Sequence, residues 1–219
     1  MENEEAELAA LHLSGKLIAP LPLYEQIKEE LELIREAWSD SIVHVNMLFD
    51  PFWTESRIKV NVNSTTFDSM RLGEYHHWDS LNDYYRIDTI TFGQSFSSTY
   101  RWANLNFGGR LNPILLVDLY AGLPGFTSVT SVTTYALGDR PILLLLRDDQ
   151  TVKYFFRYAY GDCPSGCAIS EIYYFTVEQK EAKYHGSYFT YPQDSIRPVW
   201  FDTFLIAFDK YYAWNQLPD

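Results

Sequence analysis

The chain has 219 residues and a formal net charge of −12, and 47% of its residues are hydrophobic and 17% aromatic. This length and apolar content allow a sizeable buried core, whereas the negative charge repels phosphate backbones and anionic lipid, so we expect no nucleic acid among its partners. No run of about 18 apolar residues occurs, so we expect no transmembrane segment in the chain.

The N-terminal part is expected to form an arm and then a helix. Residues 1–19 are acidic and have few large apolar groups, which predicts a solvated, flexible arm. Residues 22–38 carry apolar side chains three and four positions apart, which predicts an amphipathic helix. Its apolar stripe consists of Tyr24, Ile27, Leu31, Ile34 and Trp38. The alternation in residues 42–50 predicts a strand.

The middle of the chain alternates between strand and helix patterns. In order, it predicts a strand at 57–63, a helix at 75–85, strands at 88–92 and 100–107, a helix at 112–121 and a strand at 126–135. This order is typical of the split βαβ, or ferredoxin-like, arrangement, in which two helices cover one face of a four-stranded antiparallel sheet.

The C-terminal part is expected to form a β-meander with strands at 141–147, 151–160, 168–178 and 183–191. Residues 198–214 follow, for which we favour a helix, with a strand as the alternative. The predicted fold is therefore α+β: an N-terminal amphipathic helix, a ferredoxin-like sheet and a meander. The expected parts are a flexible arm at 1–19, the helix with the ferredoxin-like unit at 20–135, and the meander with the C-terminal segment at 136–219.

The two cysteines, Cys163 and Cys167, lie in a Pro-Gly turn between two predicted strands. A redox pair normally has two intervening residues at a helix start, and zinc needs four ligands, of which only Asp162 and His185 are nearby candidates. We therefore favour a local disulfide, with a redox pair, a metal clip and free thiols as alternatives. Because disulfides persist in oxidising compartments, the pair favours an exported protein, periplasmic or at the cell surface, with a signal sequence outside this chain. A cytoplasmic location is the alternative.

Two stretches carry a resemblance to known proteins. "YAYGDCPSGCAISEIYYFTV" and the preceding "NLNFGGRLNPILLVDLYAGLPG" resemble a pattern in uncharacterised exported bacterial proteins, many of which have lipoprotein-type signals. The shared features are a G-D-C-x-x-G-C turn, an L-N segment as in "WDSLNDYY" and a Y-x-x-L-P-G helix stop, over about residues 14–185. The resemblance implies export, a disulfide and no evident active site.

Residues 115–133 are similar to the end of subtilisin-like protease propeptides, which also have the split βαβ order. The chain departs from that pattern because Phe126 stands where the propeptides have valine, and because a meander follows instead of a cleavable extended tail. This resemblance implies a protease inhibitor or propeptide-like protein as an alternative function.

A search for catalytic and metal-binding patterns gives no strong signal. None of the five histidines has a metal-binding spacing, and no nucleophile or phosphate-binding motif is present, so we expect no catalytic residue, metal or cofactor. An enzyme with an unrecognised site around His76, His77 and Asp79, or around Asp162, is the second alternative function. A calcium ion in the acidic turns of the meander is the remaining metal alternative.

The aromatic side chains of the meander are the remaining candidate. Both faces of the strand at 151–160 are apolar enough to need cover, so we favour burial of both faces. If one face is exposed, it is a surface for a protein, a peptide or a glycan. The candidate surface comprises Tyr154, Phe156, Tyr158, Tyr160, Tyr173 and Tyr174. We therefore expect a non-enzymatic, exported binding or interaction module.

Overall fold

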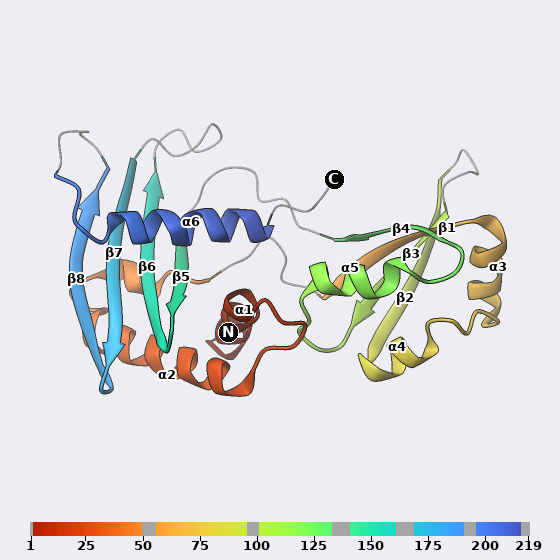
Figure 1. Ribbon diagram of the computed structural model, residues 1–219, viewed down its shortest axis with the longest axis horizontal. Helices are drawn as coiled ribbons and strands as arrows, with labels where there is room; N and C mark the ends of the chain where they lie inside the picture. Colours follow the sequence, from red (N-terminus) through yellow and green to blue (C-terminus); the bar gives the residue numbers. More distant parts are fainter. Residues whose placement is uncertain are drawn as a thin grey trace. The chain divides into compact units, whose positions relative to one another are not determined.

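The computed structural model describes residues 2–49, 56–95, 101–132, 141–160, 169–190 and 196–215. It is an α+β protein with two four-stranded antiparallel sheets (Figure 1). The chain divides into two compact units. Unit 1 consists of Met1–Ser14, Ala19–Phe52 and Tyr135–Pro218, and unit 2 of Gly15–Ile18, Trp53–Thr134 and Asp219. The long N-terminal helix therefore belongs with the meander, and its predicted grouping with the ferredoxin-like sheet is wrong.

Unit 2 has the predicted ferredoxin-like fold. Its elements are β1 (Arg57–Val62), α3 (Ser64–Leu72), α4 (Asp79–Tyr84), β2 (Ile87–Gln94), β3 (Arg101–Phe107), α5 (Pro113–Ala121) and β4 (Phe126–Ser131). The strands lie in the order β2-β3-β1-β4, and every neighbouring pair is antiparallel.

The helices of unit 2 share one face of this sheet, as predicted. Ile58, Val60 and Val62 of β1 belong to the same buried cluster as Leu116 and Tyr120 of α5. Phe67 and Met70 of α3 join that cluster. Because side chains alternate along a strand, the intervening residues of β1 point to the opposite face.

Helix α3 was missed by the sequence analysis although its ends carry recognisable signals. The side chain of Asn63 accepts a hydrogen bond from the backbone N–H of Thr66 at 2.8 Å, which caps the first turn. Gly73 ends the helix with φ 75°, a conformation that glycine adopts without steric cost. Asn112 caps α5, where its side chain accepts a hydrogen bond from the backbone N–H of Ile114 at 3.1 Å.

Unit 1 is built on the predicted meander. Its strands are β5 (Ile142–Asp148), β6 (Thr151–Tyr160), β7 (Ile169–Glu178) and β8 (Glu181–Phe189), in sequential order across the sheet. The helices are α1 (Glu2–Ser14), α2 (Leu21–Trp38), the short 3₁₀ helix η1 (Val43–Asn46) and α6 (Phe201–Asn215). Within the described residues, no helix combines the length and the apolar character needed to cross a membrane.

Both faces of the meander are covered by helices, as the sequence analysis favoured. Helix α6 lies across one face (Figure 1). There Phe204 contacts the ring of Phe155. Helix α2 covers the other face, where Trp38 contacts Phe175. The central strands are consequently buried on both sides, which explains their nearly continuous run of apolar residues.

Residues 2–14 form helix α1, so the prediction of a flexible acidic arm is wrong. Ala6, Ala9, Ala10 and Leu11 are fully buried. Helix α1 is seen end-on beside β5 in Figure 1. The periodicity analysis missed it because the four consecutive residues 8–11 are all buried, so the apolar side chains do not form one stripe along the helix.

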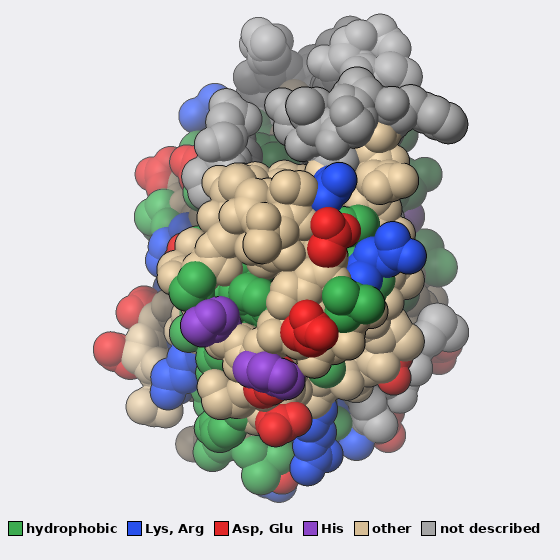
Figure 2. Space-filling view, turned by 90° about the vertical axis from the view of Figure 1, so that its right-hand side faces the viewer, with side chains coloured by type: hydrophobic (Ala, Val, Ile, Leu, Met, Phe, Trp, Pro, Cys, Tyr) green, Lys and Arg blue, Asp and Glu red, His purple; other side chains and the backbone are tan. Residues whose placement is uncertain are grey.

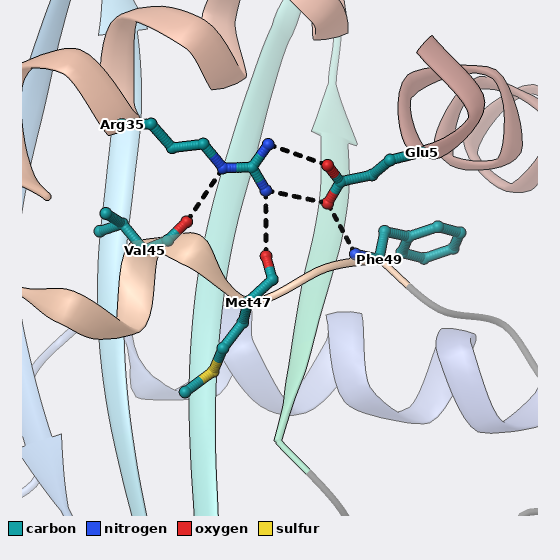
Figure 3. A network of polar contacts seen from close by, with 5 residues as sticks. All are labelled: Glu5, Arg35, Val45, Met47 and Phe49. Atoms are coloured by element: carbon teal, nitrogen blue, oxygen red, sulfur yellow. Dashed lines mark hydrogen bonds and ion pairs between the residues drawn. The ribbon is translucent and has the colours of Figure 1, made fainter. Parts of the chain in front are cut away.

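An ion pair ties α1 to α2 (Figure 3). Arg35 donates hydrogen bonds to both carboxylate oxygens of Glu5, at 2.9 Å and 3.0 Å, and the side chain of Glu5 is only 3% exposed. Arg35 also donates to the carbonyl oxygens of Val45 and Met47, while Glu5 accepts a hydrogen bond from the backbone N–H of Phe49. The pair therefore fixes the segment after α2 as well as the two helices.

The predicted strand at 42–50 is wrong, because residues 43–46 form η1. Two carbonyl groups of this segment accept hydrogen bonds from the Arg35 guanidinium, so they are satisfied without a neighbouring strand. The alternating pattern is real, since Val45 and Phe49 are buried, but it does not by itself imply a sheet.

Candidate functional site

The six residues of the predicted aromatic surface do not all lie together. Some belong to the core of unit 1, and the others lie on different faces of its sheet. Tyr154 and Phe156 are fully buried, so their rings belong to the core. Tyr174 lies on the α6 face, where it contacts Phe155 and Trp200.

Three of the predicted surface residues do come together. Tyr158 contacts Tyr160 at a ring-centre distance of 5.3 Å, and His44 of η1 stacks on Tyr158 at 4.2 Å and lies 5.6 Å from Tyr173. These rings are half-buried. They form a small aromatic cluster at one end of the unit 1 sheet.

The buried Tyr154 has a polar partner on α2. Its hydroxyl donates a hydrogen bond of 2.7 Å to Glu30, and Gln26 donates one of 2.8 Å to the other carboxylate oxygen. Burial raises the pKa of Glu30, and the two hydrogen bonds oppose this effect. The carboxylate lines a hollow of about 390 Å³ between α2 and the β7–β8 turn, where Lys180 pairs with Glu29 at 2.8 Å.

Replacing Glu30 by glutamine is expected to change the stability of unit 1 in a pH-dependent way. A carboxyl group whose pKa is higher in the folded state binds its proton more tightly there, so the free energy of unfolding falls as the pH rises from 4.5 through the raised pKa. Glutamine does not titrate, so the advantage of Glu30→Gln should grow over this interval and then stay constant, by about 1.4 kcal/mol for each unit of pKa difference. Urea unfolding between about pH 4 and pH 8 measures it, with exposed Glu32→Gln as the control. An advantage that is the same at every pH would contradict the assignment.

The remaining predicted site residues give no catalytic arrangement that can be described. Cys163, Cys167 and Asp162 lie outside the described residues, so the disulfide stays a prediction. His76 pairs with Asp79 at 2.8 Å, but their side chains are 73% and 51% exposed. In the described part of the chain, no group of three or more His, Cys, Asp or Glu side chains is placed to hold a metal ion.

The side of the molecule nearest α3 has a mixed surface. Figure 2 shows histidine side chains there among acidic, basic and hydrophobic ones, with no single kind dominating. This view gives no indication of a concentrated binding patch around α3.

The most distinctive surface is the face of the unit 2 sheet opposite its helices. Side chains of paired residues lie on the same side of a sheet, so Lys59 is beside Asn104, and Asn61 is beside Trp102. All four strands contribute side chains that remain partly or fully exposed. We call this surface the open face. It comprises Arg57, Lys59, Asn61, Thr89, Thr91, Gly93, Trp102, Asn104, Asn106, Ser128 and Thr130.

A single tryptophan forms an aromatic platform on the open face. Trp102 is paired with Gly93 of the neighbouring strand, and a Cβ at Gly93 would lie 2.1 Å from the indole ring. The absence of a side chain at Gly93 therefore lets the indole lie against the backbone of β2. The ammonium group of Lys59 is 5.0 Å from the centre of the indole ring, within cation–π range.

Cross-strand hydrogen bonds fix the polar groups around this platform. Arg57 donates to Asn106 at 2.6 Å, and Asn106 donates to the hydroxyl of Thr89 at 2.9 Å. Asn61 donates to the hydroxyl of Ser128 at 2.8 Å. These bonds fix amide and hydroxyl groups on the same face of the sheet as the indole.

The charge of the open face is opposite to that of the whole chain. Arg57 and Lys59 are basic and none of the eleven residues is acidic, whereas the chain has a net charge of −12. The face therefore favours an anionic group locally, although the whole molecule repels polyanions at long range.

The comparisons with known proteins add no assignment. No protein-family model, no curated protein and no solved structure matches the chain. The interpretation of the open face therefore rests on its own geometry.

The sequence analysis identified the strands of the open face but did not use their outer residues. The signal was present: the residues between the buried positions of β1 are Arg57, Lys59 and Asn61, and those of β3 begin with Trp102. An ordinary solvent-facing set would include acidic residues in so acidic a chain.

Proposed function

We propose that the chain is a non-enzymatic binding module whose open face binds an acidic glycan. The observation that carries the proposal is the half-buried indole of Trp102, which lies against Gly93 and has the ammonium group of Lys59 5.0 Å from its ring centre. A sugar ring has an apolar face of C–H groups and a rim of hydroxyls. Such a ring can stack on the indole while its hydroxyls meet the surrounding amides and hydroxyls.

The basic residues of the open face, Arg57 and Lys59, favour a glycan that carries negative charge. A carboxylate on a sugar stacked on Trp102 is within reach of the Lys59 ammonium, and a charge-assisted hydrogen bond is about twice as strong as a neutral one. We therefore infer a preference for uronic-acid residues over neutral sugars.

Two other classes of partner fit the open face less well. The core of a protein–protein interface is rich in large apolar side chains, whereas Trp102 is the only one among the residues of the open face. A nucleic acid would meet two cations on a chain with a net charge of −12, so the counterion release that drives such binding would be small.

Export is part of the proposal, and it is supported by the spacing of Cys163 and Cys167 rather than by the fold. The intact mass of protein purified from an oxidising compartment tests it. A mass lower by two hydrogens supports the disulfide, and two alkylatable thiols would speak against export.

The test of glycan binding uses tetragalacturonate as the acidic probe and its methyl ester as the neutral counterpart. We expect saturable binding of tetragalacturonate in isothermal titration calorimetry and at least about tenfold weaker binding of the ester. Trp102→Ala should weaken binding of both ligands by about ten- to a hundredfold, since stacking on an aromatic side chain contributes roughly 1–3 kcal/mol. Gly93→Val should have a similar effect because its side chain displaces the indole.

Two further variants test whether glycan binding depends on Trp102 and Lys59 in particular. Lys59→Gln should reduce the preference for the acid over the ester while keeping the stacking. Tyr84→Ala removes an aromatic residue of unit 2 that lies on α4, outside the open face, and is 73% exposed; it should leave binding unchanged. Equal affinity of the parent and Trp102→Ala would exclude the open face as the site.

A further inference from the structure

A second candidate site lies in unit 1, apart from the open face and from the predicted aromatic residues. It is a pocket of about 400 Å³ between α1, β5 and α6. Ligand-binding pockets for small molecules typically have volumes of roughly 300–1,000 Å³ and apolar walls with a few polar groups. Its apolar walls are formed by Leu13, Leu145, Leu146 and Ala213.

The polar groups of the pocket are all basic. Arg147 of β5 and Lys210 of α6 line it, together with His12 of α1, and no carboxylate is among the lining residues. Neither Arg147 nor Lys210 takes part in an ion pair between described residues. In a chain with 29 acidic residues and 17 Lys and Arg residues, a pocket with only cations is an unusual arrangement.

The guanidinium of Arg147 is incompletely satisfied. One terminal nitrogen donates a long hydrogen bond of 3.4 Å to Gln150, whereas the buried Nε has no hydrogen-bond partner. An unsatisfied buried donor costs stability unless a ligand or water completes it. An anionic ligand in the pocket would provide the missing acceptor.

The third polar group is uncharged at neutral pH. Burial, assisted by the nearby charge of Lys210, lowers the pKa of His12 to about 4. Its ring packs against Phe49 and Tyr211, at ring-centre distances of 5.3 Å and 6.2 Å. His12 therefore adds to the wall of the pocket, and the positive charge comes from Arg147 and Lys210.

We propose that this pocket binds a small amphipathic carboxylate, with the carboxylate between Arg147 and Lys210 and the apolar body against the leucines. The basic residues of the pocket favour the carboxylate of such a ligand, and its apolar walls favour the hydrocarbon body. An apolar molecule without charge leaves the cations unpaired, and a small inorganic anion leaves the apolar walls without contact. Binding needs no metal, cofactor or covalent step.

The experiment uses the full chain and octanoate at pH 7, with 1-octanol and octylammonium as probes of the same length. Isothermal titration calorimetry should show one octanoate bound per chain, and at least about tenfold weaker binding of the alcohol and the ammonium ion. Arg147→Gln and Lys210→Gln should each reduce the affinity about tenfold, which is the range expected for a charge-assisted hydrogen bond. Lys210 is exposed, so its variant is expected to fold even if Arg147→Gln does not.

Two more variants locate the site. Ala213→Phe fills the pocket from an exposed position and should abolish octanoate binding without any change in charge. Lys183→Gln removes one positive charge from β8, outside the pocket, and should leave the affinity unchanged. Absence of saturable binding, equal affinity for octanol, or full affinity in Ala213→Phe would each overturn the proposal.

Discussion

Arg35→Ala is expected to lower the free energy of unfolding of unit 1 by about 3–5 kcal/mol, the usual cost of removing one partner from a buried ion pair. The side chains of Arg35 and Glu5 are only 14% and 3% exposed. The alanine variant leaves the Glu5 carboxylate buried without its counterion, and it removes the donor for the carbonyl groups of Val45 and Met47. The effect should therefore loosen both α1 and the segment after α2.

Urea unfolding followed by far-UV circular dichroism measures this loss. A double-mutant cycle with Glu5→Ala isolates the energy of the pair, because the double variant has no unpaired buried charge. Lys180→Ala is the matched control: it breaks the pair with Glu29, in which both side chains are more than half exposed, and should leave the free energy of unfolding close to that of the parent. If Arg35→Ala unfolds within about 1 kcal/mol of the parent, α1 is not held by this pair.

Leu31→Ala is expected to cost about 2–5 kcal/mol. Leu31 is 2% exposed in the middle of the apolar stripe of α2, between Ile27 and Ile34, which are fully buried. Truncation removes contacts on a helix that packs against α1 and the meander, and it leaves a cavity that the neighbouring side chains fill only in part.

The same helix supplies the control for this prediction. Glu32 follows Leu31 directly but is exposed, so Glu32→Ala should change the free energy of unfolding by about 0.5 kcal/mol or less. Equal melting of Leu31→Ala and the parent would mean that α2 packs only loosely on unit 1.

The sequence predicts those parts of the fold that local signals determine. The stripe of α2 and the Asn112 cap with Pro113 at the start of α5 each fix a helix through neighbours in sequence. The order of strands and helices in unit 2 then restricts the topology to very few arrangements, and the ferredoxin-like order is confirmed.

The features that the sequence analysis missed depend on contacts between distant residues. Helix α1 is stabilised by burial of small side chains and by the Glu5–Arg35 pair, whose partners are thirty residues apart. Likewise, Arg35 donates a hydrogen bond to the carbonyl oxygen of Val45 in η1, and α2 joins unit 1 through contacts with β7 and β8. None of these contacts leaves a periodic pattern in the sequence.

The open face likewise combines features that local sequence patterns determine with features that depend on contacts between distant residues. The alternation along β1 and β3 distinguishes the residues that face away from the core, and six of these residues belong to the open face, although they were not singled out from the sequence. The register that puts Trp102 against Gly93 depends on the pairing of β2 with β3 and was not predicted. Without that register, neither the aromatic platform nor the absence of acidic residues around it is evident.

The most direct test of the proposed function is a titration of ¹⁵N-labelled protein with tetragalacturonate, followed by two-dimensional NMR. Trp102→Phe identifies the indole N–H signal of Trp102 among the six tryptophans. We predict that this signal and the side-chain amides of Asn61, Asn104 and Asn106 shift together and saturate at one ligand per chain. Shifts confined to unit 1, or no saturable shift on the open face, would contradict the account.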